Sequence, residues 1–245
     1  LQPQSKEDFI KAVTEGLGEA PKYFAINAQI NQKGYDKLED VKKRGLQALN
    51  IDEFKKRMDK AEMIVLDTRP ATEFTTGFIP GSIFIGLEGR FAEWAGSMLP
   101  FDQPTILVTP AGKEEETVVR LARVGFDKME GYLSGGIESW KNAGETLDLI
   151  IDVEADELAM DLPHDPNLVV LDVRRETEFA DGHIQDAINL PLNEMTDLVQ
   201  LANFEDKQNL YIHCAGGYRS VIAASLFKKQ GIHNLRNVLG GWAKI

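Results

Sequence analysis

One segment of the sequence, residues 210–220, combines residue types that can do covalent chemistry. An apolar run ends at Cys214, Gly216 and Gly217 follow, and Arg219 stands five residues after the cysteine. Glycines let a backbone curl so that successive N–H groups point inward, and such a nest binds anions. A helix start and a guanidinium beside the loop add positive charge. We therefore expect this loop to stabilise a Cys214 thiolate, or a cysteine that carries an anionic adduct.

The alternative is that Cys214 only fills space, because a lone cysteine at the end of a strand is often a small buried hydrophobe. Two features speak against that: the glycines and arginine that follow it, and the recurrence of the same loop position in a second copy of the unit. His213 precedes Cys214 in a predicted strand, so its side chain points to the opposite face. The sequence thus favours a reactive cysteine without a histidine partner.

The chain contains two copies of one unit, offset by 105 residues. The pattern Leu-Asp-x-Arg, then Glu-Phe, then Gly-x-Ile occurs at residues 66–79 and again at residues 171–184. A pattern that recurs at a fixed offset is typical of a duplicated structural unit. We therefore divide the chain into a helical leader and two domains, at residues 1–48, 49–148 and 149–245.

Each copy alternates predicted strands with predicted helices. The strands are short apolar runs, typical of a parallel sheet buried on both faces; they cover 63–67, 83–85 and 105–109 in the first copy and 168–172, 188–190 and 210–214 in the second. The third run of each copy is expected at the centre of its sheet. A helix is expected to open each copy, at 51–60 and 153–160, and another to follow each third strand. The predicted fold class is α/β, with a central parallel sheet flanked by helices in each domain.

Composition excludes several classes of function. The 245 residues include 39 acidic and 27 basic ones, a formal charge of −12, so no basic face for nucleic acid is expected. A single cysteine and four scattered histidines exclude an internal disulfide and a thiolate metal cage. No apolar run is long enough to span a membrane. We expect a cytoplasmic protein with no metal or other cofactor in this chain and no nucleic-acid or membrane partner.

Residues 50–245 resemble the rhodanese family of sulfurtransferases. The resemblance is carried by Leu-Asp-x-Arg and Glu-Phe-x-x-Gly-His-Ile at 171–184, Cys-Ala-Gly-Gly-Tyr-Arg at 214–219 and Gly-Gly-Trp at 240–242. It implies that Cys214 takes a sulfane sulfur from thiosulfate or a low-molecular-weight persulfide, becomes a persulfide, and passes the sulfur to a thiol or cyanide. It also implies that Arg219 orients an anionic donor and that the loop cradles the persulfide, through Ala215, Gly216, Gly217, Tyr218 and Ser220.

Two other functions share features with this sequence. Cys-dependent phosphatases and arsenate reductases also use a cysteine loop that ends in arginine, but their arginine stands six residues after the cysteine. The shorter loop of this chain suits a sulfur adduct better than a phosphoryl group. The second alternative is a non-catalytic pair of domains that docks a partner or delivers sulfur to a persulfide dioxygenase domain.

The first copy lacks the residues that the chemistry needs. Thr109 stands where the second copy has Cys214, and Glu114 stands where it has Arg219. Pro110 removes an N–H donor from the loop. Without a thiol, and with carboxylates at the loop, we expect the first domain to be inactive and kept for packing, docking or shaping of the second site.

Several residues near the loop have a less certain assignment. Asp172 and Arg174 either brace the loop amides or form, with Glu178, an ion network that holds the fold. The same three residue types recur in the inactive copy, which favours the structural role. His183 is expected to pack, because the first copy has phenylalanine there, and Ser220 is expected to cap the helix that follows the loop.

The leader carries a second, shorter resemblance. Ser5 to Asp8 have the spacing of a helix N-cap box, and an apolar stripe follows at Phe9, Val13 and Leu17. Residues 9–34 are similar to the tail that follows the metallo-β-lactamase-like hydrolase domain in hydrolase–rhodanese fusions, which resemble persulfide dioxygenases with an iron site. We therefore expect this chain to be the C-terminal part of such a fusion, with that hydrolase domain as a partner in cis.

Overall fold

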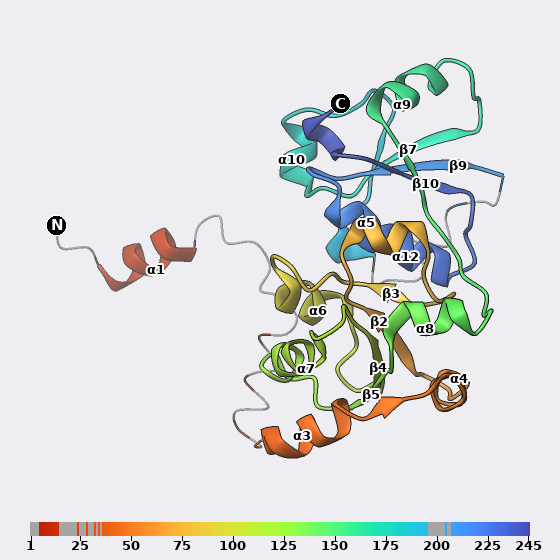
Figure 1. Cartoon of the computed structure of the whole chain (residues 1–245). Helices are drawn as coiled ribbons and strands as arrows, with labels where there is room; N and C mark the ends of the chain where they lie inside the picture. Colours follow the sequence, from red (N-terminus) through yellow and green to blue (C-terminus); the bar gives the residue numbers. More distant parts are fainter. Residues whose placement is uncertain are drawn as a thin grey trace.

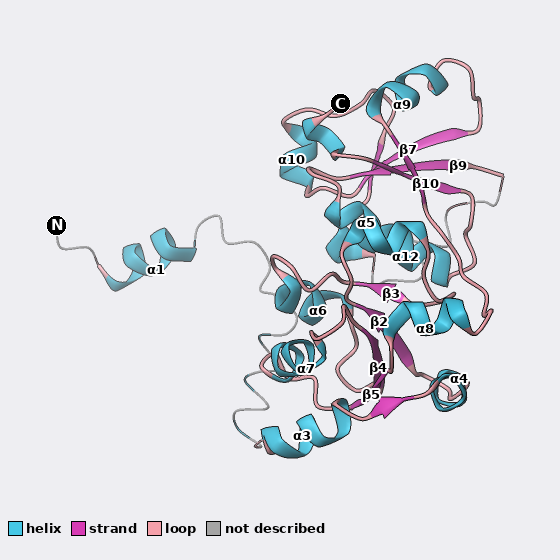
Figure 2. Ribbon diagram, in the orientation of Figure 1, coloured by secondary structure: helices cyan, strands magenta, loops and turns pink. Residues whose placement is uncertain are grey.

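The computed structural model describes residues 5–14, 24, 28, 32, 34, 36–195, 204 and 207–245. Within them, two five-stranded sheets lie one above the other, each flanked by helices (Figures 1 and 2). Every strand pair within these sheets is parallel. The predicted α/β fold with two parallel-sheet domains is therefore confirmed.

The two sheets have the same topology. The first has the strand order β1 (Ala48–Leu49), β5 (Met129–Leu133), β4 (Thr105–Val108), β2 (Ile64–Asp67) and β3 (Ile83–Phe84). The second has the order β6 (Ile151–Val153), β10 (Leu235–Val238), β9 (Asn209–His213), β7 (Leu168–Asp172) and β8 (Ile188–Asn189). In both, the strand predicted to be central, β4 or β9, lies in the middle. The identical order confirms that one unit occurs twice.

The sequence patterns identified three of the five strands in each copy. The missed strands β5 and β10 flank the central strands, and β1 and β6 pair with them at the sheet edge. β5 alternates buried and half-buried residues around Gly131, and β10 contains Arg236 and Asn237, so neither is a continuous apolar run. A search for continuous apolar runs misses strands of such mixed polarity.

The helices lie on both faces of each sheet. Around the first sheet they are α3 (Leu38–Gly45), which comes from the predicted leader but packs on α7 and β5, and α4 (Ile51–Met58), α5 (Ala71–Thr76), α6 (Phe91–Met98), α7 (Glu114–Ala122) and α8 (Gly136–Asn142) of the first repeat. In the second repeat they are α9 (Ala155–Asp161), α10 (Glu176–Ala180) and α12 (Tyr218–Lys229), with short 3₁₀ turns at Leu192–Glu194 and Gly241–Ala243. The predicted opening helices at 51–60 and 153–160 correspond to α4 and α9.

The leader contains α1 (Lys6–Thr14), which is drawn apart from the two sheets in Figure 1. The predicted cap is present, because the Asp8 amide donates to Ser5 Oγ at 3.1 Å. The apolar side chains of Phe9 and Val13 are exposed. Leu17, the third residue of the predicted stripe, lies outside the described residues. No helix in the described part of the chain is long and apolar enough to cross a membrane.

The two repeats share one hydrophobic core, and α12 lies at its centre. Figure 1 shows α12 between the two sheets, and it packs against β3 of the first repeat as well as against β9 and β10 of its own. Most of α12 is buried, with no exposed face along residues 220–228. The Phe84 amide of β3 donates to Ser225 Oγ at 3.0 Å. The helix that follows Cys214 is thus fixed by both repeats.

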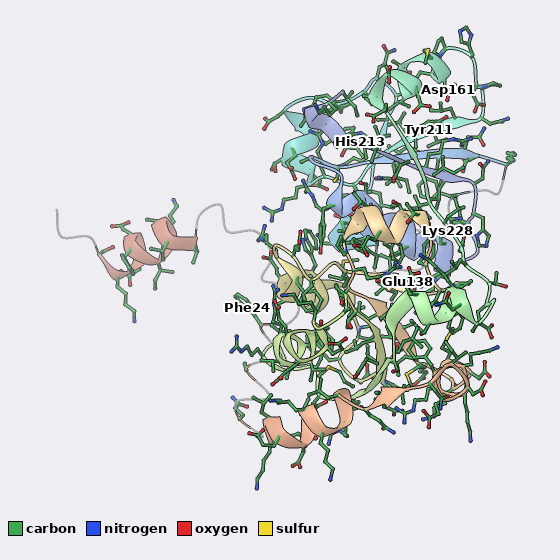
Figure 3. All side chains as sticks on the ribbon, in the orientation of Figure 1. Phe24, Glu138, Asp161, Tyr211, His213 and Lys228 are labelled. Atoms are coloured by element: carbon green, nitrogen blue, oxygen red, sulfur yellow. The ribbon has the colours of Figure 1, made fainter. Side chains whose placement is uncertain are left out.

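Polar contacts reinforce this junction. Lys228, at the end of α12, lies 2.9 Å from Asp148 and is almost completely buried (Figure 3). Thr75 of α5 donates to Asp152 of β6 at 2.7 Å. A buried ion pair that loses one partner costs several kcal/mol. The junction between the repeats is therefore specific as well as apolar.

Candidate active site

The Cys214 loop connects β9 to α12. Gly217 has φ +93°, a conformation that suits glycine, and it directs its amide toward the cysteine. That amide donates to Cys214 Sγ at 3.1 Å, and Ser220 Oγ lies 3.6 Å from the same sulfur. Tyr218 begins the 12-residue helix, so the sulfur lies at a helix N-terminus, where a negative charge is stabilised. The sulfur thus has one loop amide and one hydroxyl beside it, and stabilisation of an anion by this loop stays a prediction.

The 3₁₀ turn at Gly241–Ala243 is hydrogen-bonded to the Cys214 loop. Trp242 donates its amide to the Cys214 carbonyl at 2.7 Å, and Ala243 donates to the Ala215 carbonyl at 3.2 Å. A Cβ atom on Gly241 would collide with the Cys214 carbonyl. Glycine at position 241 is therefore required by the close approach of the two segments, and this approach fixes the position of the Cys214 backbone.

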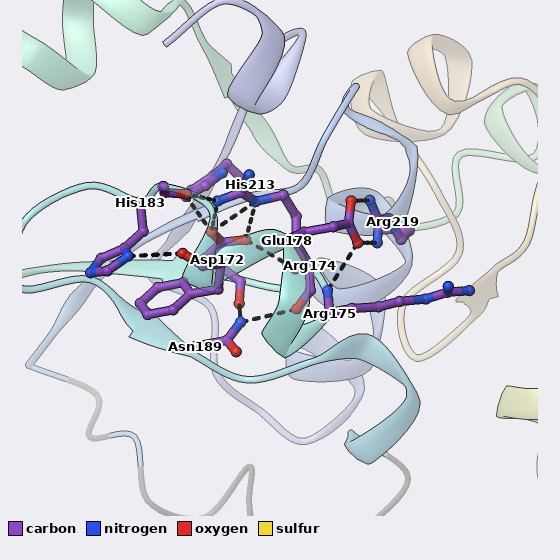
Figure 4. Close-up of polar contacts among 10 residues, drawn as sticks. Asp172, Arg174, Arg175, Glu178, His183, Asn189, His213 and Arg219 are labelled. Carbon is purple, nitrogen blue, oxygen red and sulfur yellow. Dashed lines mark hydrogen bonds and ion pairs between the residues drawn. The ribbon is translucent and has the colours of Figure 1, made fainter. Parts of the chain in front are cut away.

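Arg219 is held by a carboxylate that the sequence analysis assigned elsewhere. Its two terminal nitrogens each lie 2.7 Å from an oxygen of Glu178 (Figure 4). Glu178 also accepts a hydrogen bond from the Arg175 amide at 3.0 Å. The guanidinium lowers the pKa of Glu178 to about 2, so the carboxylate is charged at neutral pH. Arg219 therefore reaches the loop with its charge largely balanced.

Asp172 and Arg174 form a separate, deeply buried pair. Arg174 donates to both carboxylate oxygens of Asp172, and its Nη2 also donates to the Gly182 carbonyl at 2.7 Å. Asp67 and Arg69 repeat this arrangement in the first copy. The expectation that Glu178 completes this network is wrong, because Glu178 turns instead to Arg219. The pair holds a strand end to the next turn in both repeats.

The two histidines near the loop do not bond to the sulfur. His213 is fully buried, with its Nε2 3.7 Å from Asp172 Oδ2 and its ring facing Trp242. Burial lowers the pKa of His213, so its imidazole is neutral at neutral pH. His183 stacks on Phe179 and contacts the Phe179 carbonyl, on the exposed side of α10. His183 therefore packs, as expected, but on the surface rather than in the core.

Ser220 and Tyr218 have contacts that differ from those expected. Gly217 is the N-cap of α12, so the prediction that Ser220 caps this helix is wrong; Ser220 lies in the first turn against the cysteine sulfur. The resemblance placed Tyr218 in the loop that cradles the persulfide, and the Tyr218 ring lines the cavity beside Cys214. Its hydroxyl, however, donates to the Gly86 carbonyl of the first repeat at 2.8 Å. Burial raises the pKa of Tyr218, which keeps this donor protonated.

The loop opens into a cavity of about 770 Å³ between the repeats. The second repeat contributes Arg175, Glu178, Cys214, Gly216, Tyr218 and Arg219 to its lining. The first repeat contributes Pro70, Ala71, Thr72, Gly86, Glu88, Gly89, Arg90 and Trp94. No motif in the sequence pointed to this second set, because these residues come from the start of α5, the loop after β3 and helix α6, which only the packing of the two repeats brings to the cysteine.

The corresponding loop of the first repeat has no such chemistry. Thr109 is buried, and α7 begins at Glu114, so acidic side chains occupy the first helical turn. Among the described residues, no group of three histidine, cysteine or acidic side chains is arranged to hold a metal ion. The first-repeat loop thus presents a hydroxyl and carboxylates where the second presents a thiol and a guanidinium.

Comparisons with known proteins agree with this geometry. The chain is 33% identical over 107 residues to the putative sulfur carrier protein YrkF of Bacillus subtilis, covering 44% of this chain and 55% of that protein. It is 31% identical over 91 residues to a putative mitochondrial thiosulfate sulfurtransferase of Schizosaccharomyces pombe, covering 32% of this chain and 63% of that protein. The chain thus spans between half and two-thirds of the length of these two relatives.

Among solved structures, a rhodanese-like domain protein from Staphylococcus aureus is 28% identical, covers 39% of this chain and 90% of its own, and has a TM-score of 0.35. The rhodanese-like domain model matches this chain twice, at residues 50–143 and 154–245. The leader lies outside both matches, so its kinship with a hydrolase fusion stays a prediction. Because the two matches cover most of the chain and the second contains the cysteine loop, the chain belongs to the rhodanese-like family.

Proposed function

We propose that this chain is a sulfurtransferase that carries a sulfane sulfur on Cys214, from thiosulfate or a low-molecular-weight persulfide to a thiol or cyanide. The observation that carries the proposal is the Gly217 amide 3.1 Å from Cys214 Sγ, at the start of α12 and at the edge of an open cavity. An amide and a helix N-terminus stabilise a sulfur anion whether it is the thiolate or the persulfide. Relatives named as sulfurtransferases support the same chemistry.

The transfer takes two displacement steps. The Cys214 thiolate attacks the outer sulfur of thiosulfate; the new S–S bond forms, the old one breaks, and sulfite leaves with the bonding electron pair. A thiol or cyanide then attacks the outer sulfur of the persulfide, and Cys214 leaves again as a thiolate. The loop holds both anionic forms in place, and Ser220, 3.6 Å away, is the neighbouring hydroxyl.

The first repeat plays no covalent part in this proposal. Its threonine at the cysteine position has no base beside it in the sequence pattern, and Glu114 replaces the loop arginine. Its role is to complete the cavity wall and to hold Tyr218 through the Gly86 carbonyl. The function is thus divided between a reacting repeat and a supporting repeat.

Intact mass of the reduced protein after incubation with thiosulfate, and again after cyanide, tests the proposal. We expect the gain of one sulfur atom, its removal by cyanide, and no gain in Cys214→Ser. Thr109→Ser is the matched control, since it changes the equivalent position of the inactive repeat. No sulfur gain with thiosulfate or with an organic persulfide would overturn the proposal and leave a docking module as the better account.

A further inference from the structure

His213 is a buried polar side chain that the sulfur transfer proposed above does not use. It ends β9, directly before Cys214, and is completely buried. Neither ring nitrogen has a hydrogen-bond partner among the described residues, and burial of a polar group without a partner costs free energy. In the first repeat the same position, opposite the buried aspartate, holds Val108, which avoids that cost. The second repeat therefore carries a histidine where valine is sufficient for the fold.

The groups that face the His213 ring are a buried ion pair and an indole. Asp172 Oδ2, at the end of β7, lies 3.7 Å from His213 Nε2, beyond hydrogen-bond distance (Figure 4). Arg174, just after β7, already donates to both oxygens of Asp172. The Trp242 ring faces the imidazole with 6.3 Å between centroids, and Arg174 Cζ lies 4.3 Å from the indole centroid. A charge on His213 would therefore act on Asp172, on Arg174 and on the contact of each with its neighbours.

Trp242 connects this cluster to the reacting cysteine. Its backbone amide donates to the Cys214 carbonyl at 2.7 Å, so one residue carries both the indole and the hydrogen bond that holds the loop. The first repeat has Ile137 at the position of Trp242. Its segments also lie farther apart, since a Cβ atom on Gly136 would be 3.4 Å from the Thr109 carbonyl oxygen and would not collide with it. The histidine, the tryptophan and the close contact thus occur together in the repeat that has the cysteine.

The charge of His213 decides how this cluster is balanced. Burial lowers the pKa of His213, so the ring is neutral at neutral pH and leaves Asp172 to Arg174. When the ring binds a second proton, both nitrogens become donors and the new charge is attracted to Asp172. The same charge repels Arg174 and competes with it for the carboxylate, which weakens the contact of Arg174 with the indole. The position of Trp242, and of the loop bonded to it, is therefore expected to follow the charge of His213.

We propose that His213 is a positioning residue for the sulfur transfer: as the neutral imidazole it keeps Trp242 and the Cys214 loop in place, and as the imidazolium it moves toward Asp172 and displaces them. The inference rests on the transfer proposed above and adds a proton-controlled switch to it. The proton comes from solvent and binds the free ring nitrogen, so only an N–H bond forms and the step reverses when the pH rises. Acid thus stops the transfer by two routes, protonation of the thiolate and protonation of His213.

The pH dependence of sulfur gain tests this role. Single-turnover rates of mass gain at Cys214 with thiosulfate are measured from about pH 8 to about pH 5. One inactivating proton lowers a rate about tenfold per pH unit, and two lower it about 100-fold per unit at the acid end. We expect the steeper fall in the unchanged protein. The tenfold fall is expected in His213→Val, which inserts the residue of the first repeat, and in His213→Gln, which keeps a polar side chain that cannot be protonated.

A second histidine provides the matched control. His183→Phe also inserts the residue of the first repeat, but His183 is exposed and stacks on Phe179, so this variant should keep the steep profile. At about pH 8, His213→Val should lose about tenfold in rate, because the indole loses a facing ring, and His213→Gln should lose less. Equal slopes in the unchanged protein and in both His213 variants would overturn the positioning role.

Tryptophan emission follows the switch without any sulfur transfer. An imidazolium next to an indole quenches its fluorescence, so Cys214→Ser should lose emission in acid, with a midpoint below the ordinary histidine value of 6.5. The same protein with His213→Gln added should lack this step, and presence of the step in both would overturn the switch. Sulfur gain with equal slopes would overturn the role of His213 and keep the sulfurtransferase. Absence of sulfur gain at every pH would instead overturn the transfer, whatever the emission shows.

Discussion

The two repeats have the same sheet order and the same buried aspartate–arginine pair, yet they differ at one loop. In the second repeat that loop brings Cys214, the Gly217 amide and Ser220 together; in the first, Thr109 is followed by Pro110 and then by an acidic helix start. The shared features hold strand ends and turns, and the differing ones touch the sulfur. Comparison of the repeats therefore separates the residues that support the fold from those that surround the cysteine sulfur.

The repeats also contribute different elements to the junction between them. The second repeat contributes α12 to the shared core, while the first contributes β3, the loop that follows it from Gly86, and the start of α6 up to Trp94. Phe78 of the first repeat is buried against Phe74 at this junction, whereas His183, at the matching position of the second, lies on the surface. The first repeat thus forms one wall of the cavity and packs against α12.

The largest loss of stability is expected from removal of the buried aspartate that each repeat has at the same position. Asp67→Ala and Asp172→Ala each leave a buried arginine without its partner, which costs about 3–5 kcal/mol of unfolding free energy. Urea unfolding followed by circular dichroism measures the loss, and exposed Asp181→Ala should change stability by less than about 0.5 kcal/mol. If the folded fraction of Asp172→Ala no longer accepts sulfur although Asp67→Ala does, Asp172 acts on the loop and the two pairs are not equivalent.

A cysteine placed in the inactive loop should not restore its chemistry. In a Cys214→Ser background, Thr109→Cys is expected to accept sulfur at least about 100-fold more slowly than Cys214 does, a barrier difference of about 2.7 kcal/mol. Pro110 supplies no amide, and three glutamates begin the next helix. The rate of mass gain with thiosulfate measures this, and a rate near that of Cys214 would show that the fold alone activates the thiol.

Glu178 should limit the use of small anions by the active repeat. Glu178→Gln frees the charge of Arg219, so kcat/KM for thiosulfate is expected to rise about tenfold, or about 1.4 kcal/mol. Steady-state rates with cyanide as acceptor measure it, with Glu73→Gln at the matching position of the first repeat as the control. An unchanged or lower kcat/KM would mean that the pair positions Arg219 rather than masks it.

The same carboxylate has a signature in the pH dependence of stability. The pKa of Glu178 is lowered to about 2 in the folded protein, so its contribution is present above the unfolded value near 4.5 and is lost as the pH falls toward 2. Glu178→Gln should therefore unfold with a weaker pH dependence between pH 4.5 and 2. Urea midpoints across this window provide the measurement, and parallel curves for the two proteins would contradict the pairing.

Much of the site was predictable because its signals are local. The cysteine loop spans few residues, and the repeat offset identified the duplication and the copy that has Thr109 in place of the cysteine. The pairing of Arg219 with Glu178 was not predictable, since it joins residues 41 positions apart and Arg174 was an equally good partner by spacing. The cavity wall was missed for the same reason: Tyr218 and Gly86 are 132 positions apart and meet only through packing of the repeats. Long-range contacts between apolar and backbone groups leave no periodic pattern in a sequence.

The smallest effect tests the contact by which the first repeat holds the active loop. Tyr218→Phe removes the hydroxyl that donates to the Gly86 carbonyl and should cost about 1 kcal/mol of unfolding free energy. Tyr132→Phe in β5 is the control, because no hydrogen bond of its hydroxyl is found among the described residues. Urea unfolding gives the stability, and KM for an organic persulfide reports on the cavity wall. A KM that rises in Tyr218→Phe while the rate with saturating donor is kept would show that the first repeat shapes the site. If neither stability nor KM changes, the Tyr218 hydroxyl contributes nothing to the junction, which then depends on the shared core and on its other polar contacts.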